Sequence, residues 1–146
     1  MTSKMNGAQV ILRMLELHGV SHVFGLPGET TIGWYKEWQK SSNIEFVLTR
    51  DERTASYAAE SYAKITGRPA VLEAPSPGVT PAAPGITEAY QSSVPVTNYS
   101  SDIPVKQDKK HGLTGVDQTA LYDSISKESF YLTDVKDIPH LLRRAF

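Results

Sequence analysis

The sequence predicts an α/β fold in which an open, mostly parallel β-sheet carries helices on both faces. Short apolar runs alternate along the chain with longer stretches whose apolar residues recur at helical spacing. Turns that contain Gly and Pro join the two kinds of segment, and helical connections of about a dozen residues lead to parallel strands through right-handed crossovers. The chain has 146 residues, of which 40% are hydrophobic. That is enough to bury one core, so we expect a single domain over residues 1–146.

The first half of the chain begins with a helix and continues with two strand–helix pairs. Apolar residues between Val10 and Leu17 share one broad helical face, and Gly19 is placed to end this helix. Pro27 and Gly28 form the turn after the first strand. The elements expected after the first helix are strand 22–24, a weaker helix around 32–38, strand 44–48 and helix 51–66.

The second half continues the alternation. Gly67 ends the preceding helix, and Pro81 and Pro84 complicate the start of the helix that follows, because proline removes a backbone donor. Thr97 and Asn98 interrupt the last strand, which would be mostly apolar if it lay at the centre of a parallel sheet. The expected elements are strand 70–72, helix 78–90, strand 94–99, a polar loop 100–115 and helix 134–146.

The composition of the chain limits the classes of binding partner that we expect. The 15 basic and 16 acidic residues give a net charge of −1, so no electrostatic footprint indicates binding to nucleic acid or to an anionic membrane surface. No apolar run approaches the roughly 20 residues of a membrane span, and the first residues lack the apolar core of a secretory signal. The chain has no Cys, which excludes disulfides and thiolate zinc sites and fits a reducing compartment. We therefore expect a cytoplasmic protein.

Common catalytic and phosphate-binding motifs are missing. The sequence has neither a G-x-G-x-x-G after its first strand nor a G-x-x-x-x-G-K-S/T. His18, His22, His111 and His140 are not spaced as zinc ligands, so we expect no metal site. Ser76 lies near a Gly-containing turn but outside a G-x-S-x-G elbow, so a serine nucleophile has little support.

Three segments follow strands and lie at one predicted edge of the sheet. Gly25-Leu26-Pro27-Gly28-Glu29 follows the first strand, Thr49-Arg50-Asp51-Glu52-Arg53 the second and Pro75-Ser76-Pro77-Gly78 the third. Open α/β sheets bind their ligands at the carboxyl ends of the strands. Glu52 is the carboxylate of the second segment and the principal candidate for chemistry.

Two roles for Glu52 fit the local sequence. Thr49-Arg50-Asp51-Glu52 matches the capping box S/T-x-x-E, in which the glutamate reaches back to the amide of the N-cap residue. A carboxylate at the strand edge, partly surrounded by apolar walls, could instead exchange a proton with a ligand nitrogen. Spacing alone does not decide between them.

Several segments of the chain, in order, resemble the N-terminal, pyrimidine-binding domain of thiamine diphosphate enzymes, and most closely the acetolactate synthase-like group. The resemblance runs over nearly the whole chain. The segments that carry it are Gly-Val-Ser-His-Val-Phe-Gly-Leu-Pro-Gly-Glu (19–29), Leu-Thr-Arg-Asp-Glu-Arg-Thr-Ala (48–55), Ser-Tyr-Ala-Lys-Ile-Thr-Gly-Arg-Pro (61–69), Pro-Gly-Ile-Thr-Glu-Ala-Tyr (84–90), Val-Pro-Val (94–96), Ser-Asp-Ile-Pro (101–104) and Val-Asp-Gln-Thr-Ala-Leu (116–121).

The resemblance implies a three-layer thiamine diphosphate-binding fold and roles for particular residues. Glu52 matches the glutamate that hydrogen-bonds N1′ of the cofactor's aminopyrimidine and so promotes removal of the thiazolium C2 proton. The parent enzyme is expected to act on a 2-oxo acid, by decarboxylation, carbon–carbon bond formation or both. The resemblance places Pro27, Gly28, Pro75, Ser76 and Gly78 near the cofactor, and Gly25, Leu26 and Glu29 near the substrate.

The same resemblance implies that part of the enzyme lies elsewhere. The family binds the diphosphate and its Mg²⁺ through a separate C-terminal domain with a Gly-Asp-Gly motif, and these residues contain no such motif. We expect the chain to need a diphosphate-binding domain or chain, within a homo-oligomer of the parent enzyme. It could be an excised or truncated domain, or a subunit of a naturally split enzyme. The rival expectation is a non-catalytic α/β interaction module in which Glu52 caps a helix.

Overall fold

The computed structural model describes residues 4–40, 43–106, 112 and 114–146. Four strands form one sheet, and every neighbouring pair is parallel. The order β2-β1-β3-β4 places the first and third strands at the centre. The strands are β1 (His22–Gly25), β2 (Glu45–Leu48), β3 (Ala70–Glu73) and β4 (Val96–Tyr99).

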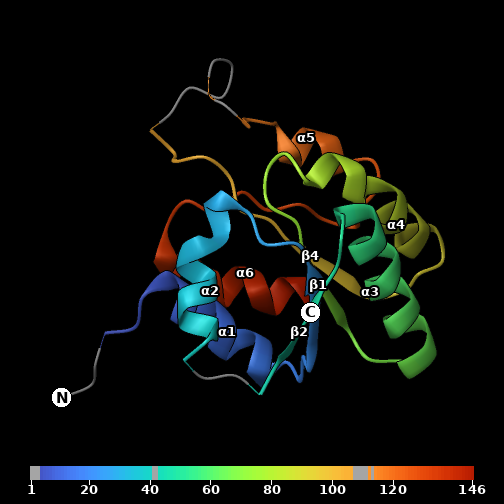
Figure 1. Cartoon of the computed structure of the whole chain (residues 1–146), viewed down its shortest axis with the longest axis horizontal. Coiled ribbons are helices and arrows are strands. Elements are labelled where there is room, and N and C mark those ends of the chain that lie inside the picture. The colour runs from blue at the N-terminus through green and yellow to red at the C-terminus, as the bar shows by residue number, and fades with distance from the viewer. Residues whose placement is uncertain (1–3, 41–42, 107–111, 113) are drawn as a thin grey trace.

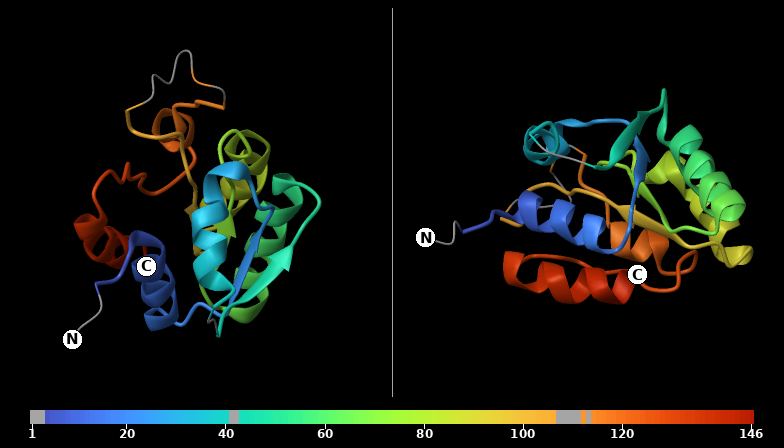
Figure 2. Two further views of the ribbon diagram at one scale, coloured as in Figure 1. Left: turned by 60° about the vertical axis from the view of Figure 1, so that its left-hand side comes forward. Right: turned by 90° about the horizontal axis from the view of Figure 1, so that it is seen from below.

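Helices cover both faces of this sheet, as the sequence predicts (Figures 1 and 2). On one face α3 (Glu52–Thr66) packs against α4 (Val79–Gln91), and this pair encloses a core rich in alanine. On the other face lie α1 (Gly7–Leu17), α2 (Ile32–Trp38) and α6 (Ile138–Ala145), around a core that includes two tryptophans. The predicted three-layer α/β class is therefore confirmed.

Three short helical elements complete the described chain. They are η1 (Glu29–Thr31), α5 (Gln118–Tyr122) and η2 (Val135–Asp137). Helix α5 is absent from the prediction, because five residues are too few for an apolar period to show. It is fixed to α4 by Tyr122, whose buried hydroxyl donates to the Val79 carbonyl oxygen over 2.8 Å.

The ends of the helices follow local sequence signals. Asn6 and Gln9 form a capping box at the start of α1. Gly19, with φ +73°, follows α1, and Gly67, with φ +67°, follows α3, so both glycines end helices as predicted. One detail of the predicted α1 face is wrong, because Leu17 is 63% exposed.

The polar residues of the last strand are explained by its position. Strand β4 contains Thr97 and Asn98 and is half-buried throughout. It lies at the edge of the described sheet rather than at its centre, where both faces would be covered. Asn98 still has a buried Oδ1 without a hydrogen-bond partner among the described residues.

Two further sequence expectations concern the loop at 100–115 and membrane spans. Part of this loop lies outside the described residues, and so does His111. Among the helices of the described residues, none is long and apolar enough to cross a membrane.

Candidate functional site

The carboxyl ends of the strands meet at one edge of the sheet. Gly25, the last residue of β1, is in register with Leu48 of β2 and with Glu73 of β3. Glu73 is in turn in register with Tyr99 of β4. The three segments that the sequence singled out therefore leave the sheet side by side.

Glu52 lies directly against the third of these segments. A Cβ atom built on Gly78 would come within 2.3 Å of Glu52 Oε1, which is closer than any side chain allows. The same pair of helices approaches again at Gly85, where a Cβ atom would meet Ser56 Oγ at 2.3 Å. Glycine at both positions lets α3 and α4 pack closely, and this packing holds the Glu52 carboxylate over the start of α4.

The predicted capping box at Glu52 is wrong. Asp51, and not Thr49, is the N-cap residue of α3, and its side chain accepts a hydrogen bond from the Thr54 amide over 2.7 Å. The Thr49 hydroxyl instead donates to the carbonyl oxygens of Gly25 and Asp51. Glu52 is the first residue of the helix, and no described residue hydrogen-bonds its carboxylate.

The first and third segments also contact each other. A Cβ atom on Gly28 would lie 2.5 Å from the Pro75 ring, so the two turns touch where Gly28 has no side chain. The Thr31 hydroxyl holds this turn by donating to the Gly28 carbonyl oxygen over 3.0 Å and accepting from the Gly28 amide at 3.1 Å. Thr31 is itself 1% exposed. The turn after β1 is thus anchored on its inner side.

The remaining predicted site residues differ in exposure. Pro27 and Glu29 are exposed, and Leu26 is half-buried. Pro75, Ser76 and Gly78 are buried. The Ser76 amide donates to the Ser101 carbonyl oxygen, and the Ser76 hydroxyl donates to the Thr114 carbonyl oxygen. Ser76 thus ties the third segment to the chain beyond β4.

Sequence reasoning missed one carboxyl group at this edge. Glu73 ends β3, is fully buried, and accepts a hydrogen bond from the Tyr35 hydroxyl over 2.7 Å. A Cβ atom on Gly25 would lie 2.6 Å from the Glu73 carbonyl oxygen and 2.9 Å from its Oε2. Glycine at position 25 therefore makes room for this side chain. A glutamate that ends an apolar strand, Val71-Leu72-Glu73, is the signal that could have identified it.

The environment of Glu73 disfavours its charge. Burial raises the pKa of Glu73 to about 7, while hydrogen bonds from Tyr35 and Thr31 oppose the rise and the nearby Glu52 carboxylate adds to it. The shift extends to its neighbours: burial, together with Glu73, raises the pKa of Tyr99 to about 12. Two carboxyl groups with different surroundings therefore lie at one strand edge.

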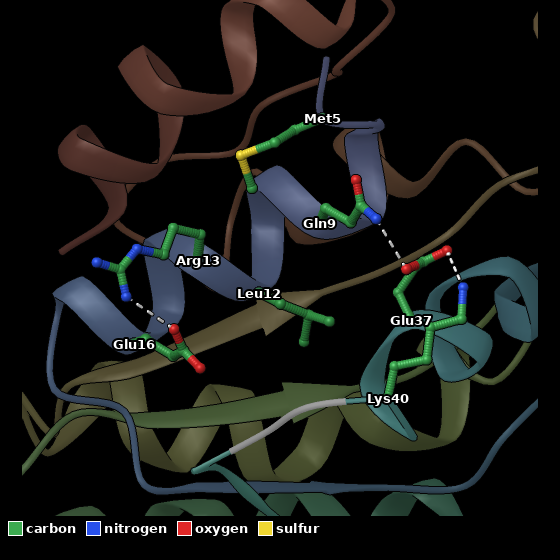
Figure 3. A pocket seen from close by; sticks show the side chains of 7 residues that line it. All are labelled: Met5, Gln9, Leu12, Arg13, Glu16, Glu37 and Lys40. Carbon is green, nitrogen blue, oxygen red and sulfur yellow. Dashed lines mark hydrogen bonds and ion pairs between the residues drawn. The ribbon is translucent and has the colours of Figure 1, made fainter. Parts of the chain in front are cut away.

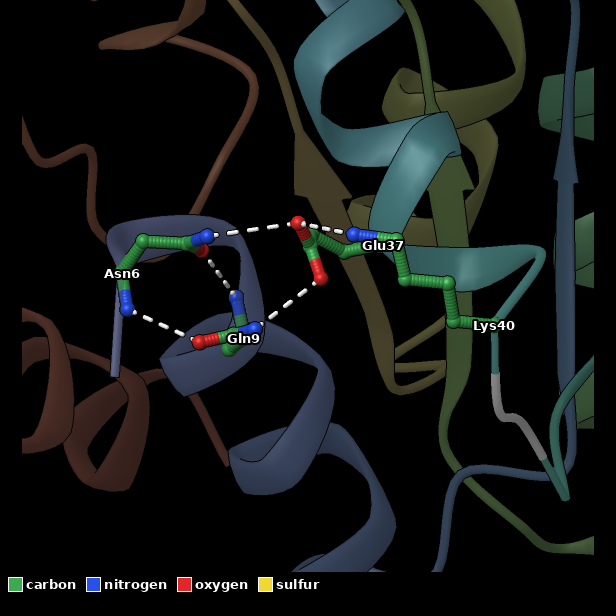
Figure 4. A network of polar contacts seen from close by, with 4 residues as sticks. All are labelled: Asn6, Gln9, Glu37 and Lys40. Carbon is green, nitrogen blue, oxygen red and sulfur yellow. Dashed lines mark hydrogen bonds and ion pairs between the residues drawn. The ribbon is translucent and has the colours of Figure 1, made fainter. Parts of the chain in front are cut away.

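Two surface hollows lie away from this edge. One of about 420 Å³ lies between α1 and α2 and is lined by Met5, Gln9, Leu12, Arg13, Glu16, Glu37 and Lys40 (Figure 3). Its polar side chains bond mainly to one another: Glu37 accepts from Asn6, Gln9 and Lys40 (Figure 4). The other, of about 260 Å³, lies beside α1 and α6. Neither contains a residue that the sequence analysis assigned to the site.

Comparison with known proteins assigns the family. The family model described as "Thiamine pyrophosphate enzyme, N-terminal TPP binding domain" matches residues 5–121. The chain belongs to this family of thiamine pyrophosphate enzyme domains. The cofactor that the family implies is thiamine diphosphate.

Relatives of this thiamine pyrophosphate enzyme domain are much longer proteins. It is 33% identical over 143 residues to a probable acetolactate synthase large subunit of Methanocaldococcus jannaschii, covering 97% of this chain and 24% of that protein. It is 35% identical over 144 residues to acetolactate synthase 2, chloroplastic, of Nicotiana tabacum, covering 96% of this chain and 21% of that protein. The chain thus spans about a quarter or less of the relatives it matches.

A solved structure supports the fold. The chain superposes with a TM-score of 0.88 on a putative thiamin diphosphate-dependent enzyme from Mycobacterium smegmatis, at 22% identity, over 97% of this chain and 28% of that one. At this identity the likeness concerns the fold alone.

The residues at the strand edge fit the pyrimidine end of the implied cofactor. An aminopyrimidine offers ring nitrogens and an amino group, for which a carboxylate without internal partners is a suitable acceptor. Glu52 is such a carboxylate, and it lies against Gly78, where the absence of a side chain makes room for it. In contrast, the described residues contain no group of three or more His, Cys, Asp or Glu side chains that could hold a metal ion.

Proposed function

We propose that this chain is the pyrimidine-binding half of an acetolactate synthase-like thiamine diphosphate enzyme that acts on a 2-oxo acid. The observation that carries the proposal is the Glu52 carboxylate, which lies against Gly78 at the carboxyl edge of the sheet without a hydrogen-bond partner among the described residues. The family match and the acetolactate synthase relatives support the same reading.

Each proposed residue has a specific task. Glu52 accepts a hydrogen bond from N1′ of the aminopyrimidine and holds the proton that this nitrogen exchanges during activation. Pro27, Gly28, Pro75, Ser76 and Gly78 form the surface against which the pyrimidine end rests, and Gly25, Leu26 and Glu29 face the substrate. The bound cofactor supplies the electron sink for cleavage and formation of bonds at a 2-oxo carbon, which side chains cannot provide.

We further propose that a second domain or chain completes the site. It would bind the diphosphate and Mg²⁺, for which the described residues offer no cluster of ligands. In this arrangement residues 1–146 form one domain, and the active site lies between it and the diphosphate-binding domain of an oligomer. The small share of each relative that the chain covers supports this division.

The test of Glu52 is the substitution Glu52→Gln in the chain assembled with its diphosphate-binding domain. Glutamine keeps the shape of the side chain but cannot hold the exchanged proton. We expect exchange of the C2 proton, followed by NMR in deuterated buffer, to fall by at least about a hundredfold, the typical contribution of general acid–base catalysis. Unchanged exchange would sink the assignment of Glu52.

A matched control is available on the same helix. Glu60 lies two turns further along α3, where it pairs with Lys64 over 3.0 Å. Glu60→Gln makes the same chemical change away from the strand edge, so C2 proton exchange is expected to stay at the wild-type rate. An equal loss in both variants would indicate damage to α3 rather than loss of a catalytic group.

Calorimetric titration of thiamine diphosphate with Mg²⁺ tests the need for a second domain. We expect binding only when the chain and the diphosphate-binding domain are mixed, because most of the cofactor's charge lies on the diphosphate. Tight binding to this chain alone would contradict the proposed division of the site.

A further inference from the structure

A fourth segment joins the three that leave the carboxyl edge of the sheet. It follows β4 and runs beside the third segment. The Ala74 amide donates to the Tyr99 carbonyl oxygen over 3.3 Å. Two residues further along both segments, the Ser76 amide donates to the Ser101 carbonyl oxygen over 3.2 Å. This spacing is that of a parallel ladder, so the pairing of β3 with β4 continues past both strands as far as Ser101.

Ser101 also contacts the first segment and α5. Its hydroxyl lies 2.6 Å from the Thr30 hydroxyl, in a hydrogen bond to which either oxygen can donate. Its carbonyl oxygen accepts a second hydrogen bond, from Gln118 Nε2 of α5 over 3.0 Å. One residue therefore connects the turn after β1, the turn after β3 and helix α5.

The hydrogen bond between Thr30 and Ser101 spans the end of the central strand β3. In the order β2-β1-β3-β4, strands β1 and β4 are not neighbours, so the segments that follow them are separated by the third segment. That segment is contacted from both sides, because the Pro75 ring lies against Gly28 and Ser76 is bonded to Ser101. The two hydroxyls thus tie the first segment to the fourth across the third.

The outer side of the first segment has few other anchors. Thr31 holds its inner side through two hydrogen bonds with Gly28. Among the side chains of residues 26–30, only that of Thr30 forms a hydrogen bond within the described part of the chain. Its neighbour Glu29 is exposed. The position of Glu29 therefore depends on the contact that Thr30 makes with Ser101.

We propose that Ser101 is a positioning residue of this site, whose hydroxyl holds Thr30 and with it the outer side of the 25–29 turn. The inference rests on the proposed function, because the position of Glu29 matters for catalysis only if this residue faces the substrate. Ser101 itself touches neither substrate nor cofactor in this scheme. It acts through Thr30.

The proposal predicts that two kinetic effects separate. Glu52 is held in a different way, by the close packing of α3 on α4 at Gly78 and Gly85. Loss of the Ser101 hydroxyl therefore releases the segment that faces the substrate but leaves the carboxylate that activates the cofactor. Affinity for the substrate should fall, and exchange of the C2 proton should be retained.

The first experiment follows the backbone amide shifts of the full chain by NMR in Ser101→Ala and Thr30→Val. Alanine keeps the carbonyl group that bonds Ser76 and Gln118, and valine matches threonine in shape. We expect Ser101→Ala to shift the amide signals of residues 29–31, and Thr30→Val to shift those of residues 100–102. The double variant should add little to either single change, because both remove the same bond. Signals that stay at their wild-type positions across the pair would overturn the proposal.

A second pair of hydroxyls supplies the matched control. Ser126 and Ser129 are half-buried, and their hydroxyl oxygens lie 3.1 Å apart. The hydrogen bonds of these two side chains involve none of the four strand-end segments. Ser129→Ala removes a comparable bond, so it should leave the amide signals of residues 29–31 and the KM of the assembled enzyme as in wild type. Equal changes in Ser129→Ala and Ser101→Ala would contradict a specific role for Ser101.

The second experiment uses the assembled enzyme, with pyruvate as the 2-oxo acid probe. In Ser101→Ala we expect KM for pyruvate to rise about threefold to tenfold, the effect of losing one neutral hydrogen bond. Thr30→Val should raise KM by a similar factor. The rate of C2 proton exchange should stay at the wild-type value in both variants. An unchanged KM, or a loss of C2 proton exchange as large as the rise in KM, would overturn the proposal.

Failure of the proposed function has a different signature. It appears as unchanged C2 proton exchange in Glu52→Gln. The amide shifts do not depend on that result, so they test the contact between Thr30 and Ser101 in either case.

Discussion

Two carboxyl groups lie on opposite sides of the molecule's α2 contacts: Glu37 belongs to α2, and Glu73 of β3 accepts a hydrogen bond from Tyr35 of α2. Glu37 lies toward α1, where it accepts from Gln9 Nε2 over 3.0 Å and from Lys40 Nζ over 2.9 Å (Figure 4). These donors, the Lys40 bond foremost, lower the pKa of Glu37. Glu73 lies toward the strand edge with a buried Oε1 that has no partner. Burial raises its pKa to about 7.

This difference distinguishes the structural contact between α1 and α2 from the candidate site at the strand edge. Where α1 meets α2, the polar side chains that line the hollow pair with one another: Glu37 accepts from Gln9 and Lys40, and Arg13 pairs with Glu16 (Figure 3). At the strand edge one carboxylate, Glu52, has no hydrogen-bond partner among the described residues, and another, Glu73, is only half satisfied. A buried polar atom without a partner, such as Glu73 Oε1, costs stability and is characteristic of functional sites. The larger hollow is therefore not the better candidate site.

The largest effect expected from this comparison concerns stability against pH. The folded-state pKa of Glu73 is raised from 4.5 to about 7, so its stabilising contribution is present below about pH 4.5 and is lost as pH rises through 7. The shift corresponds to a loss on the order of 3 kcal/mol. In Glu73→Gln this loss should disappear. Urea unfolding of both chains at pH 5 and pH 8 measures it, and parallel pH dependence in the two would refute the assigned ionisation.

A smaller effect is expected from filling the space beside Glu73. Gly25→Ala would place a Cβ atom 2.6 Å from the Glu73 carbonyl oxygen, and a backbone atom cannot yield as a flexible side chain can. We expect a loss of about 1–3 kcal/mol from overpacking. Gly33→Ala in α2 is the matched control, because a Cβ atom there meets nothing within 4 Å. It should stabilise the helix by about 0.5–1 kcal/mol. Chemical denaturation at pH 6 compares the two, and destabilisation by both would contradict this account.

The smallest effect on stability is expected from Glu37. The pKa of Glu37 is lowered by Lys40 and Gln9, so its contribution is present above its ordinary pKa and is lost as pH falls through the folded-state value. Glu37→Gln should therefore reduce the loss of thermal stability below about pH 4.5. It should leave the dependence between pH 5 and pH 8 as in wild type. Calorimetric Tm values across both ranges test this, and a change confined to the neutral range would reverse the roles of the two groups.

Much of the fold could be predicted from the sequence, because the signals that begin and end helices are local. Gly19 and Gly67 end helices at positive φ, as their positions predict. The five-residue helix α5 was missed, because it is too short for a helical spacing of apolar residues to show in the sequence. The predicted capping box at Glu52 is wrong for a related reason. Thr49 and Asp51 both suit an N-cap position, and the Thr49 hydroxyl donates to the carbonyl oxygen of Gly25 in the neighbouring strand. Local patterns cannot rank two caps when a distant segment decides between them.

The sequence by itself determined the alternation of strands and helices, the strand-edge positions of the three candidate segments and the family resemblance. Only the tertiary structure brought Glu52 against Gly78, Gly28 against Pro75 and Glu73 behind Gly25. Those contacts join segments from different strands and depend on sheet order and on how closely two helices pack. The state of Glu73 was likewise decided there, because its pKa depends on burial and on neighbours that are distant in the sequence.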